Sequence, residues 1–465
     1  MAMVFYDTET TGIKSSFDQI LQFAAILTDN DLNEIERFEI RSRLLPNVVA
    51  SPGAMQVTRI TVDTLHDASL PSHYEMTCQI REKLLTWQPA IFIGHNSLRF
   101  DEAFLRSAFY KSLLPHYLTN TNGNSRMDTL SMLQWAHAYE PDALTVPTRQ
   151  GGGLVFKLDQ LAPANGFVHS NAHEAMADVE ATIFMARLLR DKAPETWSRA
   201  MRFSSKHNVI DFCESELVFG LTEYYFNRPY SFLLHLLGRN PHDGNELVAF
   251  DLANDLDEFR QMSSDQIRRR ISRSPKPIRR LRANSLPGLI DADDAHPLTR
   301  VSDVPMHLIE DRAEELNGDE TLKARLFEAY LYEKPEYEDS PHVEENIYSG
   351  FPSSGDSLLM SAFHETDWSE RFAIVSQFED PRFRELGEQL IYFESPSSLS
   401  PDRREICKRR VIQRLLGSGE PCDALTLHDA LQQANDLISN TDGIDQARLT
   451  EHRERIEDQL AELQL

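Results

Sequence analysis

Cysteine is scarce in this chain, and long apolar runs are missing. Four cysteines occur among 465 residues, far apart and without a CxxC pair: Cys78, Cys213, Cys407 and Cys422. This spacing argues against a disulfide framework or a metal–thiolate centre and predicts a reducing, cytoplasmic location. No apolar run is long enough to cross a bilayer, and the N-terminal MAMVFYDTETTG lacks the basic start and apolar core of a signal peptide. We expect no membrane association.

Positive charge is also in short supply. The chain carries 47 Lys and Arg against 73 Asp and Glu, a formal net charge of −26. This balance argues against a nucleic-acid-binding surface over the whole molecule. It leaves room for a local one, because a bound divalent cation reverses the field at a carboxylate site and basic residues can line a groove.

A dense basic segment, residues 268–282 (RRRISRSPKPIRRLR), runs against this acidic balance. One interpretation makes it a wall that follows the phosphates of a single strand, with Arg279 and Arg280 as contacts. The other makes it a solvated helix followed by an ordinary strand, with Pro275 and Pro277 between them. The sequence favours neither. Replacement of Arg279 and Arg280 by Ala should weaken single-strand binding only under the first.

Hydrophobic patterning divides the chain into three parts. Residues 1–192 alternate strand and helix patterns, which predicts an α/β domain with a mixed sheet; strands are expected at 4–6, 20–27, 38–44 and 90–94, and helices at 74–85, 102–113, 129–139 and 174–189. Residues 200–345 are less regular and β-containing, and their polar end, 333–340, is typical of a linker. Residues 350–465 are predicted to be helical, with helices at 358–363, 368–378, 383–393, 403–416, 425–438 and 447–463.

Asp7 and Glu9 form the first candidate site. They lie two apart at the end of a predicted strand, so both carboxylates point to one face of the sheet. Carboxylate oxygens suit hard cations such as Mg²⁺ and Mn²⁺. Taken alone, an Asp-x-Glu pair is more often a solvated turn.

Three further residues join this pair in separate segments. Asp101 follows a second apolar strand, where it could equally be a helix N-cap. His173 and Asp178 are five residues apart, about 140° on a regular helix, so they share a site only if His173 precedes the helix and Asp178 lies about one turn in. Four converging carboxylates would repel one another, and two divalent ions would relieve that repulsion and promote phosphodiester hydrolysis, with a neutral His173 as the proton acceptor.

The motifs DTETTG, HNSLRFD and NAHEAMADVEAT resemble, in this order, the three motifs of the DEDDh exonuclease superfamily. The phrases QFAAI, FDEAF and NIYSGFPSSGD narrow the resemblance to bacterial exonuclease I. It implies a ribonuclease-H-like exonuclease domain, an SH3-like middle domain and a C-terminal helical domain. It also implies 3′→5′ degradation of single-stranded DNA to mononucleotides in DNA repair and recombination.

The resemblance assigns roles to individual residues. Asp7, Glu9, Asp101 and Asp178 would hold two Mg²⁺ ions, with Mn²⁺ as a substitute, and His173 would be the general base. Thr10 and Thr11 would lie beside the 3′-terminal nucleotide, Glu9 would also bind substrate, and Asn96 and Phe100 would be secondary substrate contacts. A monomer is expected, with the C-terminal tail of single-stranded DNA-binding protein as a partner.

Two other functions remain open from the sequence. A ribonuclease or proofreading exonuclease would keep the chemistry and change the substrate, although the large C-terminal extension argues against small RNA-trimming enzymes. A non-catalytic nucleic-acid adaptor would keep the fold alone, although the intact acidic and histidine positions argue against it.

Overall fold

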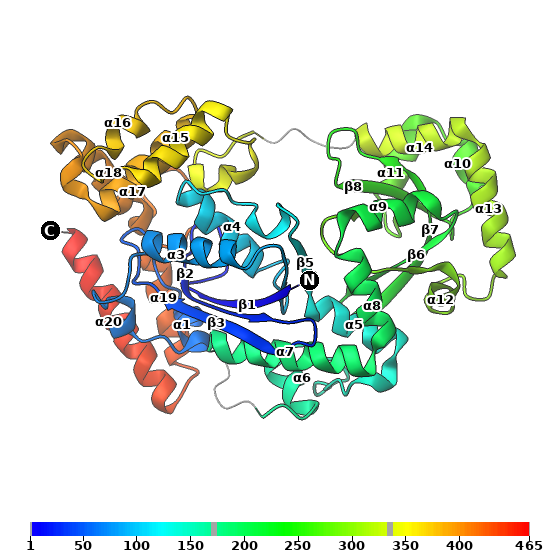
Figure 1. The fold of residues 1–465 in the computed structure, drawn as a ribbon, viewed down its shortest axis with the longest axis horizontal. Coiled ribbons are helices and arrows are strands. Elements are labelled where there is room, and N and C mark those ends of the chain that lie inside the picture. Colours follow the sequence, from blue (N-terminus) through cyan, green and yellow to red (C-terminus); the bar gives the residue numbers. More distant parts are fainter. Residues whose placement is uncertain (1, 169–173, 333–337, 465) are drawn as a thin grey trace.

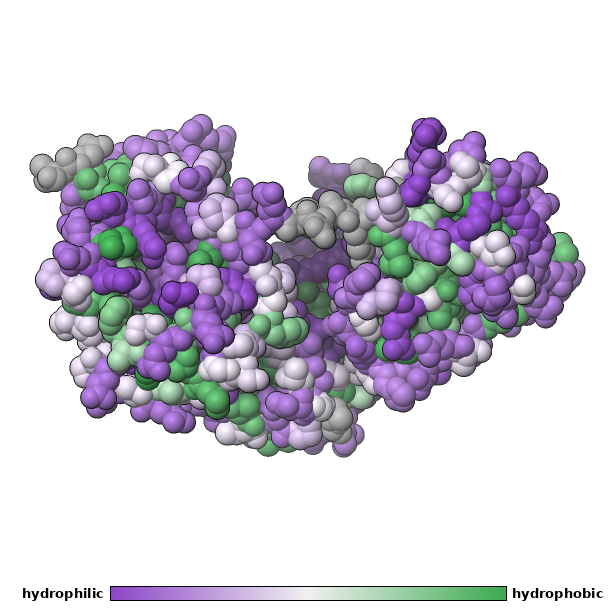
Figure 2. Space-filling model, turned by 90° about the horizontal axis from the view of Figure 1, so that it is seen from above, coloured by the Kyte–Doolittle hydropathy of each residue, from purple (hydrophilic) through white to green (hydrophobic). Residues whose placement is uncertain are grey.

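The structure is a computed structural model that describes residues 2–168, 174–332 and 338–464. Two bodies are visible in Figure 1: one holds the first sheet and the C-terminal helices, and the other holds the second sheet. Seen from above, the surface is hollowed between them (Figure 2). None of the helices in the described ranges is long and apolar enough to cross a membrane.

The first sheet is mixed, with strand order β3-β2-β1-β4-β5. Its strands are β1 (Ala2–Thr10), β2 (Ile20–Thr28), β3 (Glu34–Arg41), β4 (Ala90–Gly94) and β5 (Ser125–Asp128). The central strand β1 pairs antiparallel with β2 and parallel with β4. Its first half, residues 2–6, is a continuous apolar run, and both faces of that half are covered.

Alternate residues of β1 enter two different cores. Met3 and Phe5 pack on one face, where α7 lies, while Val4 and Tyr6 pack on the other, where α3 and α4 lie. The helices of this part are α1 (Pro52–Thr58), α2 (Val62–Leu65), α3 (His73–Thr86), α4 (Asp101–Lys111), α5 (Thr129–Tyr139), α6 (Leu158–Ala164) and α7 (Ala175–Lys192). Odd-numbered residues of β1 therefore point toward α7, which places the site described below.

The second sheet is antiparallel, with strand order β10-β6-β7-β8-β9. Its strands are β6 (Phe219–Tyr225), β7 (Arg228–Arg239), β8 (Glu246–Asp251), β9 (Ile278–Arg282) and β10 (Leu289–Asp291). One face packs against α9, and the other packs against the later helices, including α14. The helices are α8 (Pro194–Phe203), α9 (Lys206–Ser215), α10 (Leu256–Gln261), α11 (Ser264–Ile271), α12 (Ala292–Ala295), α13 (Met306–Gly318) and α14 (Glu320–Tyr332).

The C-terminal part is helical and returns to the first sheet. Its helices are α15 (Ser354–Glu365), α16 (Arg371–Val375), α17 (Pro381–Glu394), α18 (Pro401–Leu416), α19 (Leu427–Ile438) and α20 (Gly443–Gln464). Both α19 and α20 contact α1, and His452 on α20 is hydrogen-bonded through Nε2 to the Ala50 carbonyl at 2.9 Å. The last helices thus lie beside the turn that follows β1.

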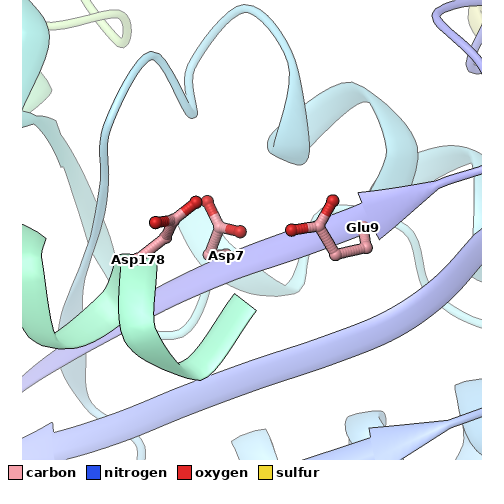
Figure 3. A group of neighbouring side chains, drawn as sticks. All are labelled: Asp7, Glu9 and Asp178. Atoms are coloured by element: carbon pink, nitrogen blue, oxygen red, sulfur yellow. The ribbon is translucent and has the colours of Figure 1, made fainter. Parts of the chain in front are cut away.

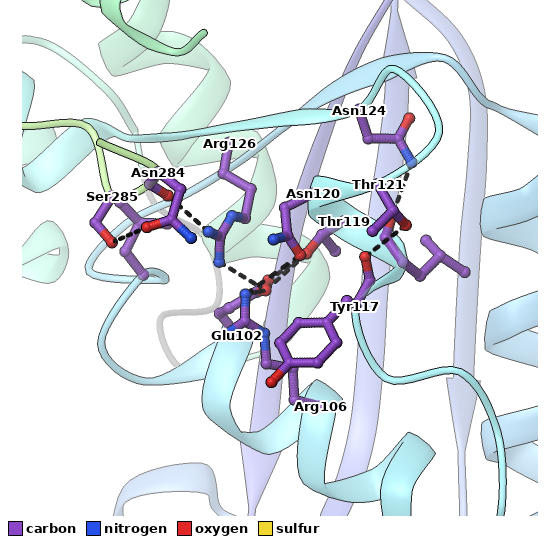
Figure 4. Close-up of polar contacts among 12 residues, drawn as sticks. Glu102, Arg106, Tyr117, Thr119, Asn120, Thr121, Asn124, Arg126, Asn284 and Ser285 are labelled. Atoms are coloured by element: carbon purple, nitrogen blue, oxygen red, sulfur yellow. Dashed lines mark hydrogen bonds and ion pairs between the residues drawn. The ribbon is translucent and has the colours of Figure 1, made fainter. Parts of the chain in front are cut away.

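A polar network joins the two bodies (Figure 4). The buried Arg126 at the edge of the first sheet donates to Glu102 at 2.8 Å and to the carbonyl of Asn284, beyond β9, at 2.7 Å. Arg106 pairs with the same Glu102 at 2.7 Å. One carboxylate therefore compensates two guanidinium groups at the junction.

The predicted fold class is confirmed: a mixed-sheet exonuclease-type domain, a β-containing middle and a helical C-terminal part. The helix predicted at 129–139 has those bounds, whereas the one predicted at 368–378 is reduced to α16. Trp368 leaves the helical path because its ring stacks under the Arg371 guanidinium at 3.7 Å. The basic segment forms α11 and β9 with Pro275 and Pro277 between them. Residues 333–337 of the predicted linker lie outside the described ranges.

Candidate active site

Three carboxylates converge beside the central strand (Figure 3). Asp7 and Glu9 project from β1 and Asp178 from the first turn of α7, and each offers an oxygen within 4.8 Å of the others. Strand alternation puts Asp7 and Glu9 on the face that α7 covers, so the packing of α7 brings Asp178 to them. These three residues are the part of the predicted site that the structure gathers most closely.

Asp101 is held next to this group. It is 3% exposed, and its Oδ1 accepts hydrogen bonds from Thr8 N at 3.0 Å and Thr8 Oγ at 2.6 Å. It is the first residue of α4, after Phe100, and its side chain reaches across to β1. The N-cap alternative therefore does not describe its position. Thr8, which sequence reasoning missed, orients this carboxylate.

Burial and mutual repulsion raise the pKa values of these acids. Burial is the first cause at Asp7, whose pKa is well above the ordinary range, and Asp101, Glu9 and Asp178 raise it further. Burial, Asp178 and Asp101 raise the pKa of Glu9 to about 8 against the opposing effect of Arg41. Burial raises the pKa of Asp101 to about 7, although the bonds from Thr8 oppose the shift. Excess negative charge of this kind, on oxygen donors alone, fits a hard divalent cation.

The predicted general base, His173, lies outside the described residues. Helix α7 begins at Ala175, so Asp178 lies in its first turn, as the spacing analysis required. A second histidine, His95, lies near the acids. Burial lowers the pKa of His95, and the charges of Asp128 and Asp178 oppose that shift. Its Nδ1 faces Thr129 Oγ at 3.2 Å and its Nε2 faces the Phe156 carbonyl at 2.9 Å. Both nitrogens are committed to the framework.

Asp128 is a further buried acid that sequence reasoning missed. It ends β5, and its carboxylate accepts from the N–H groups of Asn96, Leu98 and Leu130 at 3.0, 3.1 and 2.9 Å. It thereby fixes the turn that carries Asn96, whose φ is +64°. The available signal was its place directly before the helix predicted at 129–139.

A cavity of about 960 Å³ opens beside the carboxylates. Glu9, Thr10 and Phe100 form its inner wall, and residues 422–436 of the C-terminal part form the outer one. Thr10 Oγ donates to the Gly12 carbonyl at 2.7 Å. Thr11 is fully buried, and its hydroxyl donates to Asp18 at 3.0 Å, so it supports the turn rather than lining the cavity. Lys14 and Asp423 pair at 2.6 Å across the cavity mouth.

The two predicted phosphate contacts lie on opposite faces of β9. Arg279 packs over the Phe232 ring at 3.7 Å and pairs with Glu223 at 3.4 Å. Arg280 interacts with Tyr330 of α14, on the other face. Successive residues of a strand alternate in direction, so the two side chains point to opposite faces of the second sheet.

Comparisons with known proteins agree with this geometry. The family model RNase_T, described as Exonuclease, matches residues 4–185. The chain is 28% identical to exodeoxyribonuclease I of Escherichia coli over 82% of its length and 83% of the relative's, and 27% identical to the Haemophilus influenzae enzyme over 82% and 84%. Escherichia coli exonuclease I in complex with a dA16 oligonucleotide superimposes with a TM-score of 0.85 at 23% identity, covering 98% of this chain and 99% of that one.

A buried carboxylate group on the central strand of a ribonuclease-H-like sheet defines the class: a metal-dependent exonuclease. The similarity extends beyond residues 4–185 into the second sheet and the C-terminal helices. The chain is thus similar to exodeoxyribonuclease I along most of its length, and its fold is that of the solved exonuclease I.

Proposed function

We propose that this protein removes mononucleotides from the 3′ end of single-stranded DNA by phosphodiester hydrolysis. The observation that carries the proposal is the group of Asp7, Glu9 and Asp178, with oxygens within 4.8 Å and raised pKa values at the first two. Such an arrangement has little use in a non-catalytic adaptor, because it leaves buried like charges uncompensated. The match along 82% of the chain favours this function over that of a ribonuclease or proofreading domain alone.

Asp7, Glu9, Asp101 and Asp178 would hold two Mg²⁺ ions, with Mn²⁺ as a substitute. When bound, such ions supply a more acidic water and charge stabilisation at the leaving 3′-oxygen. His173 would accept the proton of the attacking water through a ring nitrogen. Thr8 orients Asp101, and His95 stays in the framework.

The 3′-terminal nucleotide would occupy the cavity beside Glu9. Thr10 and Phe100 line that cavity and would contact the sugar and base, while Asn96 lies in the turn before Phe100. Thr11 would act through the turn that it stabilises. Arg279 and Arg280 are predicted phosphate contacts whose opposite orientations allow separate tests.

Fewer observations support the proposed location, cellular role and partners. The four cysteines are unpaired, in agreement with a reducing cytoplasm. A role in DNA repair and recombination, a monomeric state and docking of the tail of single-stranded DNA-binding protein are expected from the family. An exonuclease I has been solved with SSB and an inhibitor, and Escherichia coli exonuclease I has been solved in a zinc-bound form with single-stranded DNA.

A release assay on 3′-labelled single-stranded DNA tests the proposal. Wild-type protein should release labelled mononucleotide with Mg²⁺ and none with EDTA, and RNA of the same sequence should be a poorer substrate. Asp178→Ala should lose activity by at least about 10³-fold while its circular dichroism spectrum stays native. Glu180→Ala, two residues further along α7 and exposed, is the control. Full activity of Asp178→Ala would contradict the site assignment.

A further inference from the structure

A row of three polar residues crosses the first sheet beside the carboxylates. Glu9 on β1 is the register partner of Gln22 on β2, and Gln22 is the register partner of Arg41 on β3. Partners on neighbouring strands point to the same face of a sheet, and for Glu9 this is the face that α7 covers. Neighbouring strands lie about 4.8 Å apart, so Arg41 is two strands away from Glu9, a distance that the long arginine side chain can largely span. Arg41 therefore borders the carboxylate group from the edge of the sheet.

The Arg41 guanidinium joins the edge of the sheet to the start of α7. Its Nη2 donates to Glu174 Oε1 at 3.2 Å and lies 3.6 Å from Glu39 Oε1. Glu39 also accepts from Nε2 of the buried Gln22 at 2.8 Å, which holds the acid that faces the arginine. The side chains of Arg41 and Glu174 are 35% and 43% exposed, so solvent screens their attraction. The pair therefore adds little to global stability.

Glu174 occupies a sensitive place in the chain. It is the N-cap residue of α7, and its carbonyl oxygen accepts from the N–H groups of Ala177 at 2.8 Å and Asp178 at 3.1 Å. It also directly follows His173, the predicted proton acceptor. Consecutive Cα atoms are about 3.8 Å apart, so the position of Glu174 restricts where His173 can lie. One residue thus connects Arg41 both to a predicted metal ligand and to the predicted base.

A second arginine on β3 provides a contrast. Arg37 points to the same face and pairs with Glu180 of α7 at 3.2 Å, the same distance as in the first pair. The exposed fractions are similar, 48% and 45%. The register row of Arg37, however, runs through Ile26 to Phe5 and is apolar. The Arg37 pair therefore attaches α7 to the sheet on a row that does not include Glu9.

We propose that Arg41 is a positioning residue of the nuclease reaction: through Glu174 it sets where the first turn of α7 lies against the central strand, and so holds Asp178 and the chain that carries His173 in their working positions. This role rests on the proposed function and adds Arg41 and Glu174 to the residues on which it depends. Neither of the two needs to touch the substrate or a metal ion. The effect falls on turnover, because a displacement of about 1 Å in a catalytic group can cost about 100-fold in rate.

Steady-state kinetics on 3′-labelled single-stranded DNA with Mg²⁺ test this role. Arg41→Ala should lower kcat by about 10- to 100-fold and leave KM within about threefold of wild type, because contacts to the strand remain. Glu174→Ala should lower kcat by a similar factor. The double variant should lose no more than either single one, because the two side chains act as a pair. Arg41→Lys keeps the charge and should recover at least about a third of the wild-type kcat, because a single N–H donor meets Glu174.

Hydrogen exchange of the metal-free protein gives a readout that does not depend on catalysis. In EDTA, the amide N–H groups of Ala177 and Asp178 should exchange at least about tenfold faster in Arg41→Ala, because the residue that accepts their hydrogen bonds is no longer held. Arg37→Ala is the matched control, since it breaks the pair to Glu180. Its kcat and the exchange of the first turn of α7 should stay within about twofold of wild type. Circular dichroism spectra of all the variants should be native.

Each contrary outcome has a distinct meaning. A wild-type kcat in Arg41→Ala, with or without faster exchange, would overturn the positioning role and leave an ordinary ion pair. A raised KM with unchanged kcat would overturn it in favour of a direct contact between Arg41 and DNA. Equal losses of kcat in Arg37→Ala and Arg41→Ala would also count against it, because any attachment of α7 would then serve. Wild-type protein that releases no mononucleotide would instead refute the proposed function on which the role rests.

Discussion

At the scale of single residues, the carboxylate group is a source of instability in the metal-free protein. The pKa values of Glu9 and Asp101 rise to about 8 and about 7 because burial and neighbouring acids penalise their charged forms. Active sites commonly retain such perturbed groups at a cost in stability. The closely spaced, buried carboxylates therefore both suit the site for catalysis and destabilise the protein when no metal is bound.

The raised pKa values predict that the free energy of unfolding depends on pH. Glu9 and Asp101 have folded pKa values above their unfolded ones, so the folded protein holds protons that the unfolded chain releases between about pH 4 and 8. In EDTA, their contribution to the free energy of unfolding is greatest below about pH 4 and is lost as pH rises to 8, by at most about 1.4 kcal/mol for each unit by which a folded pKa exceeds its unfolded value. Thermal unfolding at pH 5, 6, 7 and 8 measures it.

The matched variant is Glu9→Gln, which cannot titrate. It should be more stable than wild type at pH 8 in EDTA, and the difference should shrink at pH 5. Mg²⁺ should raise the Tm of wild type more at pH 8 than at pH 5, since cations bind the ionised acids. A wild-type protein whose Tm relative to Glu9→Gln is the same at every pH would contradict the electrostatic account.

At the scale of elements, the turn after β1 is fixed from several sides. Lys111 donates through Nζ to the carbonyls of Ser15, Ser16 and Asp18 at 3.4, 3.2 and 3.0 Å. The Asp18 carboxylate accepts from Thr11 Oγ and from Lys14 N. The inner wall of the cavity therefore depends on a tightly packed turn.

Gly12 is the most sensitive point of this turn. A Cβ atom at Gly12 would lie 2.4 to 2.7 Å from the Asp18 carboxylate atoms. Gly12→Ala should displace the turn, lower the free energy of unfolding by about 1–3 kcal/mol and raise KM for single-stranded DNA. Urea unfolding and steady-state kinetics check both effects.

Gly53→Ala is the control for that substitution. Gly53 lines the same cavity from α1, and the nearest atom to its added Cβ is Ser51 Oγ at 3.7 Å, an ordinary contact. Alanine is also the better helix former. Gly53→Ala should be at least as stable as wild type, and equal damage in both variants would refute the steric explanation.

The elements also show what sequence could predict. The strand pair of Asp7 and Glu9 and the place of Asp178 one turn into a helix followed from the periods of strand and helix. The roles of Thr8, His95 and Asp128 did not, because each depends on a hydrogen bond to a residue between 32 and 93 positions away.

At the scale of the whole molecule, one buried charge cluster is among the contacts that join the two bodies. The side chains of Arg126 and Glu102 are 6% and 3% exposed. Glu102 also accepts a hydrogen bond from Thr119 Oγ at 2.7 Å. Removal of Glu102 would leave two arginines without their shared carboxylate. The link from Arg126 to Asn284 crosses from one sheet region to the other.

Glu102→Ala should therefore weaken the molecule as a unit. Breaking a buried ion pair costs about 3–5 kcal/mol, because the remaining charges stay buried. Urea unfolding followed by tryptophan fluorescence should show a lower midpoint, and a second transition would mark the bodies unfolding separately. Glu75→Ala on α3, a surface capping residue, should cost about 1 kcal/mol, and an equal loss in the two variants would count against the cluster.

The outer wall of the cavity has a consequence for biosynthesis. Residues 422–436, which face the carboxylates across the cavity, leave the ribosome hundreds of residues after Asp7 and Asp178. A growing chain can assemble its acidic group early, yet it has no closed chamber for a strand end until the last helices fold back on α1. The outer wall of the cavity can therefore form only after residues 422–436 have been synthesised.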